Sequence, residues 1–499
     1  WVAAYFDLFP HGVGDLLEKR VRPLSLNEWA RILLRRRDPR FRKNRTFLFC
    51  VCALIFRREA INNARWKLTG RVSRADAETL ASVTSEDLAA AANEMEGGKG
   101  AWSALSHRLG VRALIKTMAS VHSGQSWTIY NKRSTRMIAI SYIIQMGQPL
   151  FWLTISPADI HSPIVLSMAG VHLDVTSRLK NDFPDYAEKL RLVARDPVAS
   201  ALFYHAMIEA VVSCLLRFGA SDGDGGVLGR VKGYVGMTEE QRRLSLHCHL
   251  LVWVFGYNDF DSFRNLMDKT PERYGELVKF LDRVIYNQVA TLMRDPKECL
   301  PVPPPTACFP RGDARRCPQH DSAFARLMYL DLAGLTTGAN LHKCQATCHK
   351  YNHRDSCRCG VVISSFTLLL YPDADADTDR FSVVLRRAHT HINSYNPIIQ
   401  YCTRSNMDLK VMLRDGDAKG LLFYILNYST KSEQTLDVLI PLLVPVVERI
   451  REESGGAPAK DLAVRLVRSC LCRQLSSLSI GGPAAASKVF GLPDAKLSH

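Results

Sequence analysis

The sequence lacks the short motifs that mark several large enzyme classes. It contains no G-x-x-x-x-G-K-[ST] stretch, so these residues encode no P-loop ATPase. It also contains no G-x-S-x-G nucleophile elbow and no G-x-G-x-x-G dinucleotide fingerprint. The candidate functional residues are therefore sought among its His, Tyr and Cys residues.

Acidic residues and long apolar runs are both in short supply. There are 49 Asp and Glu against 65 Lys and Arg, which gives a net charge of +16. Such an excess favours a polyanionic partner, because Lys and Arg contacts to phosphates release counterions; solubility alone is the other interpretation. The longest apolar run near the C-terminus, residues 436–447, contains Asp437 and two prolines and is too short to span a bilayer. We therefore expect nucleic acid as a partner and no membrane.

Length and cysteine usage limit the possible organisation. A chain of 499 residues is too long for one core, so two to four domains are expected. The sequence shows no signal peptide, and several of its 14 Cys lie in Cys/His clusters, which indicates metal binding in a reducing compartment. The chain begins at Trp1 and not at Met, so we expect a fragment of a longer protein.

Apolar spacing along the chain predicts an α+β protein. Residues 24–68 and 70–125 have helical periodicity, residues 150–157 form a buried strand that ends at Pro157, and residues 227–254 have strand character. The predicted segments are a helical basic domain over 1–125, a first part of a sheet core over 126–260, a helical and Cys/His-rich insert over 261–360, a second part of the core over 361–434 and a helical connector over 435–499.

A densely basic stretch lies within the first helical region. It could follow a phosphate backbone, and a solvated helix end is the alternative. The predicted DNA-binding residues are Arg35, Arg36, Arg37, Arg40, Arg42, Lys43 and Arg45.

Two histidines stand two residues apart at the start of an apolar run. In a strand, side chains repeat on one face every second residue, so His247 and His249 project together and can share a divalent ion. Glu239 and Gln241 precede them at even spacing, so one extended strand from Glu239 to His249 would place all four side chains on one face. The added oxygen ligands suit Mg²⁺ or Mn²⁺. A pair of ordinary core histidines, with Glu239 and Gln241 facing solvent, is the alternative.

Two tyrosines far downstream have helical spacing. On a helix, Tyr424 and Tyr428 would lie on one face, with Lys431 beside them. A phenol attacks a phosphodiester only with help, and Lys431 could lower the phenol pKa or hold the phosphate. The alternative is that both tyrosines are core aromatics.

A Cys/His-rich region predicts a structural Zn²⁺ site. Its predicted ligands are His342, Cys344, Cys348 and Cys357, and free thiols in a loop are the alternative. Cys299, Cys308 and Cys317 form a possible second site.

Together these residues resemble the N-terminal and Rep-endonuclease part of Helitron transposases, especially fungal proteins with a Helitron helicase-like domain. The resemblance depends on the order and spacing of short anchors. These are Leu153 to Asp159, Glu239 to His249, Asn396 to Asp408, Tyr424 to Lys431 and Gly491 to Asp494.

The resemblance implies a fold and an activity. The fold is a central antiparallel sheet of the HUH/Rep type with packed helices, and the activity is metal-dependent nicking of single-stranded or melted DNA in rolling-circle transposition. His247 and His249 would be the HUH histidines, and Tyr424 and Tyr428 the paired nucleophiles, followed by Lys431. The 5′ end of the cut strand would be held as a phosphotyrosine. A helicase domain would follow this chain, and the location would be nuclear.

Some positions depart from the family pattern. Leu244 replaces a Gly, and the zinc region reads Cys357-Arg358-Cys359-Gly360 where the family continues Cys-Arg-Phe. These departures leave two further hypotheses open: a catalytically inactive, zinc-containing DNA-binding remnant, and an accessory docking surface for a separate helicase.

Overall fold

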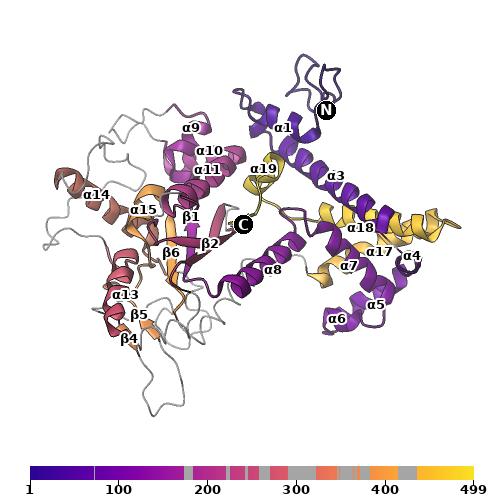
Figure 1. The fold of residues 1–499 in the computed structure, drawn as a ribbon. Coiled ribbons are helices and arrows are strands. Elements are labelled where there is room, and N and C mark those ends of the chain that lie inside the picture. Colours follow the sequence, from indigo (N-terminus) through magenta and orange to yellow (C-terminus); the bar gives the residue numbers. More distant parts are fainter. Residues whose placement is uncertain are drawn as a thin grey trace, which may run out of the picture. The chain divides into compact units, whose positions relative to one another are not determined.

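The computed structural model divides the chain into two compact units of different composition. One unit, here the helical unit, comprises Trp1–Ile138 and Asn427–Asp494, and the other, here the sheet unit, comprises Ala139–Leu426 and Ala495–His499. The structure describes residues 1–71, 73–172, 184–220, 225–241, 245–257, 270–289, 322–344, 348, 364, 368–370, 382–413 and 435–498. The α+β class predicted from the sequence is confirmed (Figure 1). Our division into five segments stays a prediction.

The helical unit is built from two stretches of chain that are far apart in the sequence. Its N-terminal helices are α1 (Leu26–Leu34), α2 (Arg40–Lys43), α3 (Arg45–Arg71), α4 (Arg74–Ala81), α5 (Ser85–Glu96), α6 (Ala101–Ala104) and α7 (Leu109–His122). Its C-terminal helices are α17 (Leu436–Glu453), α18 (Ala459–Ser476) and α19 (Gly482–Phe490). Helix α8 (Ile129–Met146) begins in this unit and ends in the sheet unit.

The apolar faces of these helices explain why the two stretches fold together. In α17 the buried side chains recur at helical spacing, from Leu439 through Leu443 to Ile450, while Pro441 and Pro445 lie on the exposed face. They share one apolar cluster with residues of α5, α7 and α18. Each large side chain that is fully buried contributes about 1.5–3 kcal/mol, so the last helices supply a large share of the core of the first.

The sheet unit contains one main sheet with helices on it. Its strands are β1 (Phe151–Ser156), β2 (Val231–Glu240), β3 (Leu246–Val254), β6 (Asn406–Val411) and β7 (Ala495–Leu497), and a separate pair is β4 (Leu368–Leu370) with β5 (Ser382–Val384). Its helices are α9 (Pro163–Met168), α10 (Tyr186–Arg195), α11 (Pro197–Ala210), α13 (Pro271–Val284), α14 (Ser322–Leu335) and α15 (Pro397–Thr403). The order in the main sheet is β6-β1-β3-β2-β7, with every neighbouring pair antiparallel.

Strand β3 is the central strand and is buried on both faces. Its odd-numbered residues share a face with Trp152 and Met237, and the last turns of α8 pack there through Ala139 and Tyr142. On the opposite face Tyr204 of α11 donates a hydrogen bond to Thr238 Oγ1 at 2.9 Å. Because β3 is hydrogen-bonded to a strand on each side, its backbone is held in place, and so are the positions from which its side chains project.

One sequence prediction about this sheet is wrong. Residues 239–249 do not form one extended strand, because β2 ends at Glu240 and β3 begins at Leu246. The two strands pair antiparallel as neighbours. The predicted strand that ends before Pro157 is confirmed as β1.

The described residues include one apolar helical stretch of membrane-spanning length, Pro197–Leu215. Within the protein, 56% of its most apolar window is buried. This is the burial of a core helix, in agreement with the contacts of α11 to β3 and α9.

Candidate metal centre

Three ligand atoms converge at one end of the central strand. His247 Nε2 and His249 Nε2 are 3.0 Å apart, and Glu239 Oε2 lies 3.2 Å from the first and 3.1 Å from the second. Both imidazoles are almost completely buried, and the Glu239 side chain is 21% exposed. In the part of the chain that the structure describes, this is the group of His, Cys, Asp and Glu residues whose ligand atoms could hold a metal ion. We call it the Glu-His-His triad.

The strand register explains why the three side chains meet. Glu239 on β2 is the direct cross-strand partner of His247 on β3, and His249 follows two residues later on the same face. The predicted sharing of one face by the two histidines is therefore confirmed. Glu239 reaches that face across the ladder and not along a single strand.

A row of side chains on neighbouring strands supports His249. Thr154 on β1 is its cross-strand partner, and Thr154 Oγ1 lies 3.0 Å from His249 Nδ1. The Trp152 ring stacks on the imidazole with centroids 5.0 Å apart. On the other side of β1, Asp408 of β6 is the direct cross-strand partner of Thr154. If His249 Nδ1–H donates to Thr154, its Nε2 lone pair is directed at the triad, as a metal ligand requires.

The electrostatics of the triad favour the protonation states of metal ligands. Burial lowers the pKa of His249, and the nearby Glu239 and Asp408 carboxylates oppose that shift only in part. Burial raises the pKa of Glu239, but contacts with His247 and His249 outweigh it and hold the pKa well below its usual range. At neutral pH the triad therefore offers an ionised carboxylate and a neutral His249 imidazole.

Sequence analysis missed Thr154, Trp152 and Asp408. Thr154 and Asp408 lie within stretches that carried the family resemblance, but nothing in a single sequence shows which residues of β1 and β6 stand beside His249. Gln241, the fourth predicted ligand, lies one residue beyond the end of β2 and is exposed, and its backbone N–H donates to the Ser245 carbonyl at 2.9 Å. Its role as a ligand stays a prediction.

The predicted nucleophiles fall on a part of the chain that is not described. Tyr424, Tyr428 and Lys431 lie between residues 413 and 435, outside the described residues. Their place relative to the triad stays a prediction.

The predicted zinc ligands are only partly within the described residues. His342 Nε2 lies 3.2 Å from the buried Cys348 Sγ, while Cys344 is exposed and Cys357 lies outside the described residues. Two of the four predicted ligands thus meet, and the Zn²⁺ site itself stays a prediction. The cysteines of the possible second site, between residues 299 and 317, also lie outside the described residues.

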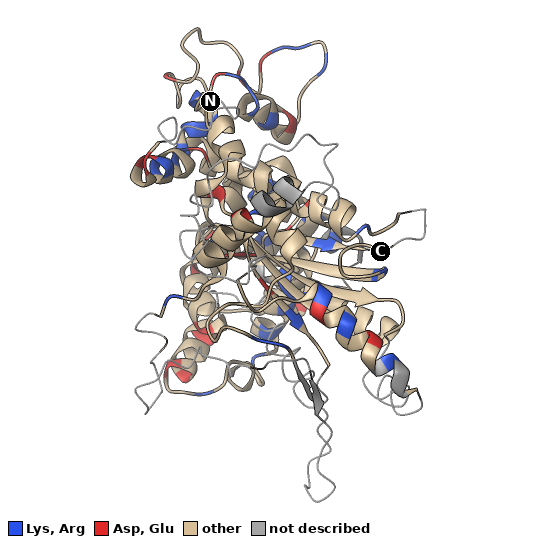
Figure 2. Cartoon of the chain, turned by 90° about the vertical axis from the view of Figure 1, so that its left-hand side faces the viewer, with Lys and Arg blue, Asp and Glu red and all other residues tan. Residues whose placement is uncertain are grey.

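The predicted DNA-binding residues lie at the end of α1, on α2 and at the start of α3. Arg35, Arg36, Arg37, Arg40 and Arg45 are exposed, and Arg42 and Lys43 are half-buried. Basic positions are blue in Figure 2, and several lie on the helices close to the N-terminus. Arg40 is engaged by Asp38, with an Nη2 to Oδ2 distance of 2.7 Å, whereas Arg35 lies over the Phe490 ring at 5.1 Å. A role for these residues in binding DNA stays a prediction.

Comparison with protein families shows which domain this chain contains. A family model described as "Helitron helicase-like domain at N-terminus" matches residues 29–252. The chain contains a Helitron-related, helicase-like domain. The match runs from α1 to β3 and so includes the whole Glu-His-His triad. No curated protein matches this Helitron-related chain. The domain indicates involvement in Helitron transposition and an interaction with nucleic acid.

Proposed function

We propose that this Helitron-related protein nicks DNA and transfers the cut strand through a 5′-phosphotyrosine, in a metal-dependent reaction in the nucleus. The substrate is single-stranded or melted DNA, and a helicase domain C-terminal to these residues would supply it. The proposal is supported by the family match over residues 29–252 and by the Glu-His-His triad that lies within it.

The observation that carries the proposal is the fit of the triad to a hard divalent ion. An octahedral Mg²⁺ or Mn²⁺ with ligand bonds of about 2.1 Å separates adjacent ligand atoms by about 3.0 Å. The three separations in the triad are 3.0, 3.1 and 3.2 Å. A tetrahedral Zn²⁺ would hold its ligands about 3.3 Å apart, so the spacing fits either kind of ion, and the choice of Mg²⁺ or Mn²⁺ rests on the carboxylate ligand. Such an ion, when bound, draws charge from a non-bridging oxygen of the scissile phosphate.

The residues of this chain would then divide the work as follows. His247, His249 and Glu239 bind the ion, and Thr154 orients the His249 ring. The phenol oxygen of Tyr424 or Tyr428 forms the new bond to phosphorus as the bond to the 3′ oxygen breaks, and the proton goes to the departing 3′-OH by way of solvent. The second tyrosine attacks the second strand end, and Lys431 stabilises the phenolate.

The test is a covalent-adduct assay. The protein is incubated with single-stranded DNA labelled at its 3′ end, because the downstream fragment stays on the protein, and with Mg²⁺ or Mn²⁺. We expect an adduct that resists denaturation, that chelation of the metal abolishes and that His247→Ala reduces at least a hundredfold. Tyr424→Phe and Tyr428→Phe identify the first nucleophile, and an adduct that survives in the double variant would refute the assignment.

The altered zinc region supports a second candidate, the inactive DNA-binding remnant. Cys359-Gly360 stands where the family pattern continues with Phe. This candidate predicts salt-sensitive DNA binding with no adduct at any metal concentration, and no effect of His247→Ala on affinity.

A further inference from the structure

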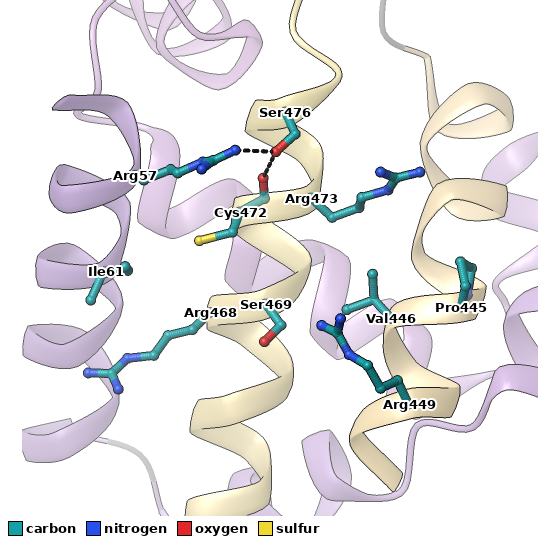
Figure 3. Close-up of a pocket in the computed structure, with 10 residues that line it drawn as sticks. All are labelled: Arg57, Ile61, Pro445, Val446, Arg449, Arg468, Ser469, Cys472, Arg473 and Ser476. Carbon is teal, nitrogen blue, oxygen red and sulfur yellow. Dashed lines mark hydrogen bonds between the residues drawn. The ribbon is translucent and has the colours of Figure 1, made fainter. Parts of the chain in front are cut away.

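A basic groove lies within the helical unit. It has a volume of about 670 Å³ and is lined by side chains of α3, α17 and α18. Four of its lining residues are arginines: Arg57, Arg449, Arg468 and Arg473. Figure 3 shows them around the groove, with Ser469 and Ser476 between them on α18. Among the described residues that line it, none is acidic.

Few of these positive charges are neutralised by the protein itself. Arg57 Nη2 donates to Ser476 Oγ at 2.9 Å, which is a neutral partner (Figure 3). Arg449 has a long and exposed ion pair with Glu453, at 3.8 Å. Arg468 Nε is buried and has no hydrogen-bond partner among the described residues. No described acid forms an ion pair with Arg473 either.

This arrangement has a cost that a ligand would remove. Like charges gathered in one groove repel each other, and a buried guanidinium N–H without an acceptor loses its hydration without compensation. Here α3 from the first stretch of the helical unit and α17 and α18 from the second bring four arginines to one groove. An anion with several acceptor oxygens would satisfy both deficits at once.

The chemistry of the lining indicates which anion. The planar fork of arginine matches the oxygens of a phosphate, and repeated arginines match repeated phosphates. Ile61, Pro445 and Val446 add apolar surface beside the charges, against which sugars and bases can pack. We propose that this groove binds the phosphodiester backbone of a single DNA strand. The choice of DNA rests on the proposed function, while the groove and its charges do not.

The test is equilibrium binding of a fluorescent single-stranded oligonucleotide to the full chain over a range of salt concentrations. The variant is the double substitution Arg468→Gln with Arg473→Gln. The matched control is Arg112→Gln with Lys116→Gln, which removes two charges from exposed positions one turn apart on α7 of the same unit. Arg468→Lys with Arg473→Lys keeps the charges and removes the forks. Circular dichroism melts verify that each variant folds.

We expect the Gln variant to bind about tenfold more weakly, with a slope of log K against log salt smaller by about 1.4, because two phosphate contacts to a single strand are lost. The control should change the affinity and the salt slope by less than half of the change seen in the Gln variant. The Lys variant should recover the salt slope but not the full affinity. Equal weakening in the variant and the control would overturn the proposal, as would binding of polyglutamate in place of the oligonucleotide.

The adduct assay separates this inference from the proposed function. An adduct that forms normally, together with unchanged affinity in the Gln variant, refutes the groove and leaves the proposed function in place. Selective loss of binding in the Gln variant of a protein that never forms an adduct refutes the strand-transfer chemistry and supports the groove.

Discussion

At the scale of single residues, a hydroxyl on the neighbouring strand contacts one histidine of the triad. Thr154 Oγ1 lies 3.0 Å from His249 Nδ1, while the other ring nitrogen, Nε2, lies 3.1 Å from Glu239 Oε2. Groups that orient metal ligands in this way typically change metal affinity by about 10–100-fold when they are removed. We therefore expect Thr154 to position His249.

We predict that Thr154→Val weakens Mn²⁺ binding at the triad by about tenfold, because the isosteric side chain cannot accept the His249 N–H. Isothermal titration calorimetry of the full chain measures the affinity. Thr154→Ser keeps the hydroxyl and serves as the control, with affinity close to that of the parent. If Val and Ser behave alike, Thr154 does not orient the ring.

A second residue-scale prediction concerns His122 in the helical unit. Burial lowers the pKa of His122 to about 4, a shift that its contact with Gln125 opposes and Lys488 increases. The unfolded chain takes up a proton below pH 6.5, whereas the folded chain does so only near pH 4, so stability falls as the pH drops through this window. The expected loss is about 3 kcal/mol at the acid end.

Urea unfolding at pH values between 4 and 7.5 measures this loss. In His122→Gln the free energy of unfolding should depend less steeply on pH in that window, while His205, whose pKa is also lowered to about 4 by burial, keeps its own share in both proteins. An unchanged pH dependence would show that His122 is not buried in its neutral form.

The sequence could predict those parts of the triad that depend on spacing within one strand, but not those that depend on how distant strands pair. The pairing of His247 with His249 is a local property of any strand and was predictable. Glu239 was predicted from an even spacing along one strand, but it reaches the histidines through the register of two strands. Thr154 and Asp408 come from β1 and β6, and a single sequence does not encode which positions of distant strands stand opposite each other.

At the scale of elements, the segment after α19 closes the start of α8. Asp494 accepts hydrogen bonds from the Trp127 N–H at 2.9 Å and from Asn131 Nδ2 at 2.8 Å. The Trp127 indole donates to the Leu492 carbonyl at 2.9 Å, and Trp127 has a left-handed backbone with φ of 68°. The Gly491-to-Asp494 anchor of the resemblance thus has a structural role in the helical unit.

We predict that Asp494→Ala lowers the free energy of unfolding by about 2 kcal/mol, because it leaves the buried Trp127 N–H and the half-buried Asn131 amide without an acceptor. Chemical denaturation followed by circular dichroism measures the change. Asp494→Asn keeps one amide oxygen as acceptor and should lose less. A loss in Ala no larger than that in Asn would show that these hydrogen bonds do not hold α8.

The elements themselves were largely predictable and their partners were not. Helical periodicity gave the helices of both ends of the chain, and Pro157 marked the end of β1. The burial of α17 and α18 against α5 and α7 was not visible, because an amphipathic face shows that a helix packs without showing on what it packs.

At the scale of the whole molecule, the helical unit needs both of its stretches. Leu88 and Leu114 share a core with Leu443 and Leu466, and all four side chains are fully buried. A fragment without the second stretch exposes this apolar surface to water.

We predict that residues 1–138 produced alone are insoluble or partly unfolded, and that coexpression with residues 435–494 yields a soluble, copurifying pair. Gel filtration and circular dichroism measure the outcome. Replacing Leu443 and Leu466 with Asp in the second fragment should abolish copurification. A monomeric, cooperatively folded 1–138 fragment would show that the first helices have a sufficient core of their own.

The order in which the chain is made gives this division a consequence in the cell. A ribosome must add all of residues 139–434 before the partner helices of α5 and α7 exist, which takes roughly 15 to 60 seconds at ordinary elongation rates. During that time the apolar faces of α5 and α7 lack the partner helices that cover them in the folded protein. A premature stop codon between residues 139 and 434 would therefore leave the apolar faces of the first helices exposed, and we expect an aggregating product and not a soluble N-terminal half.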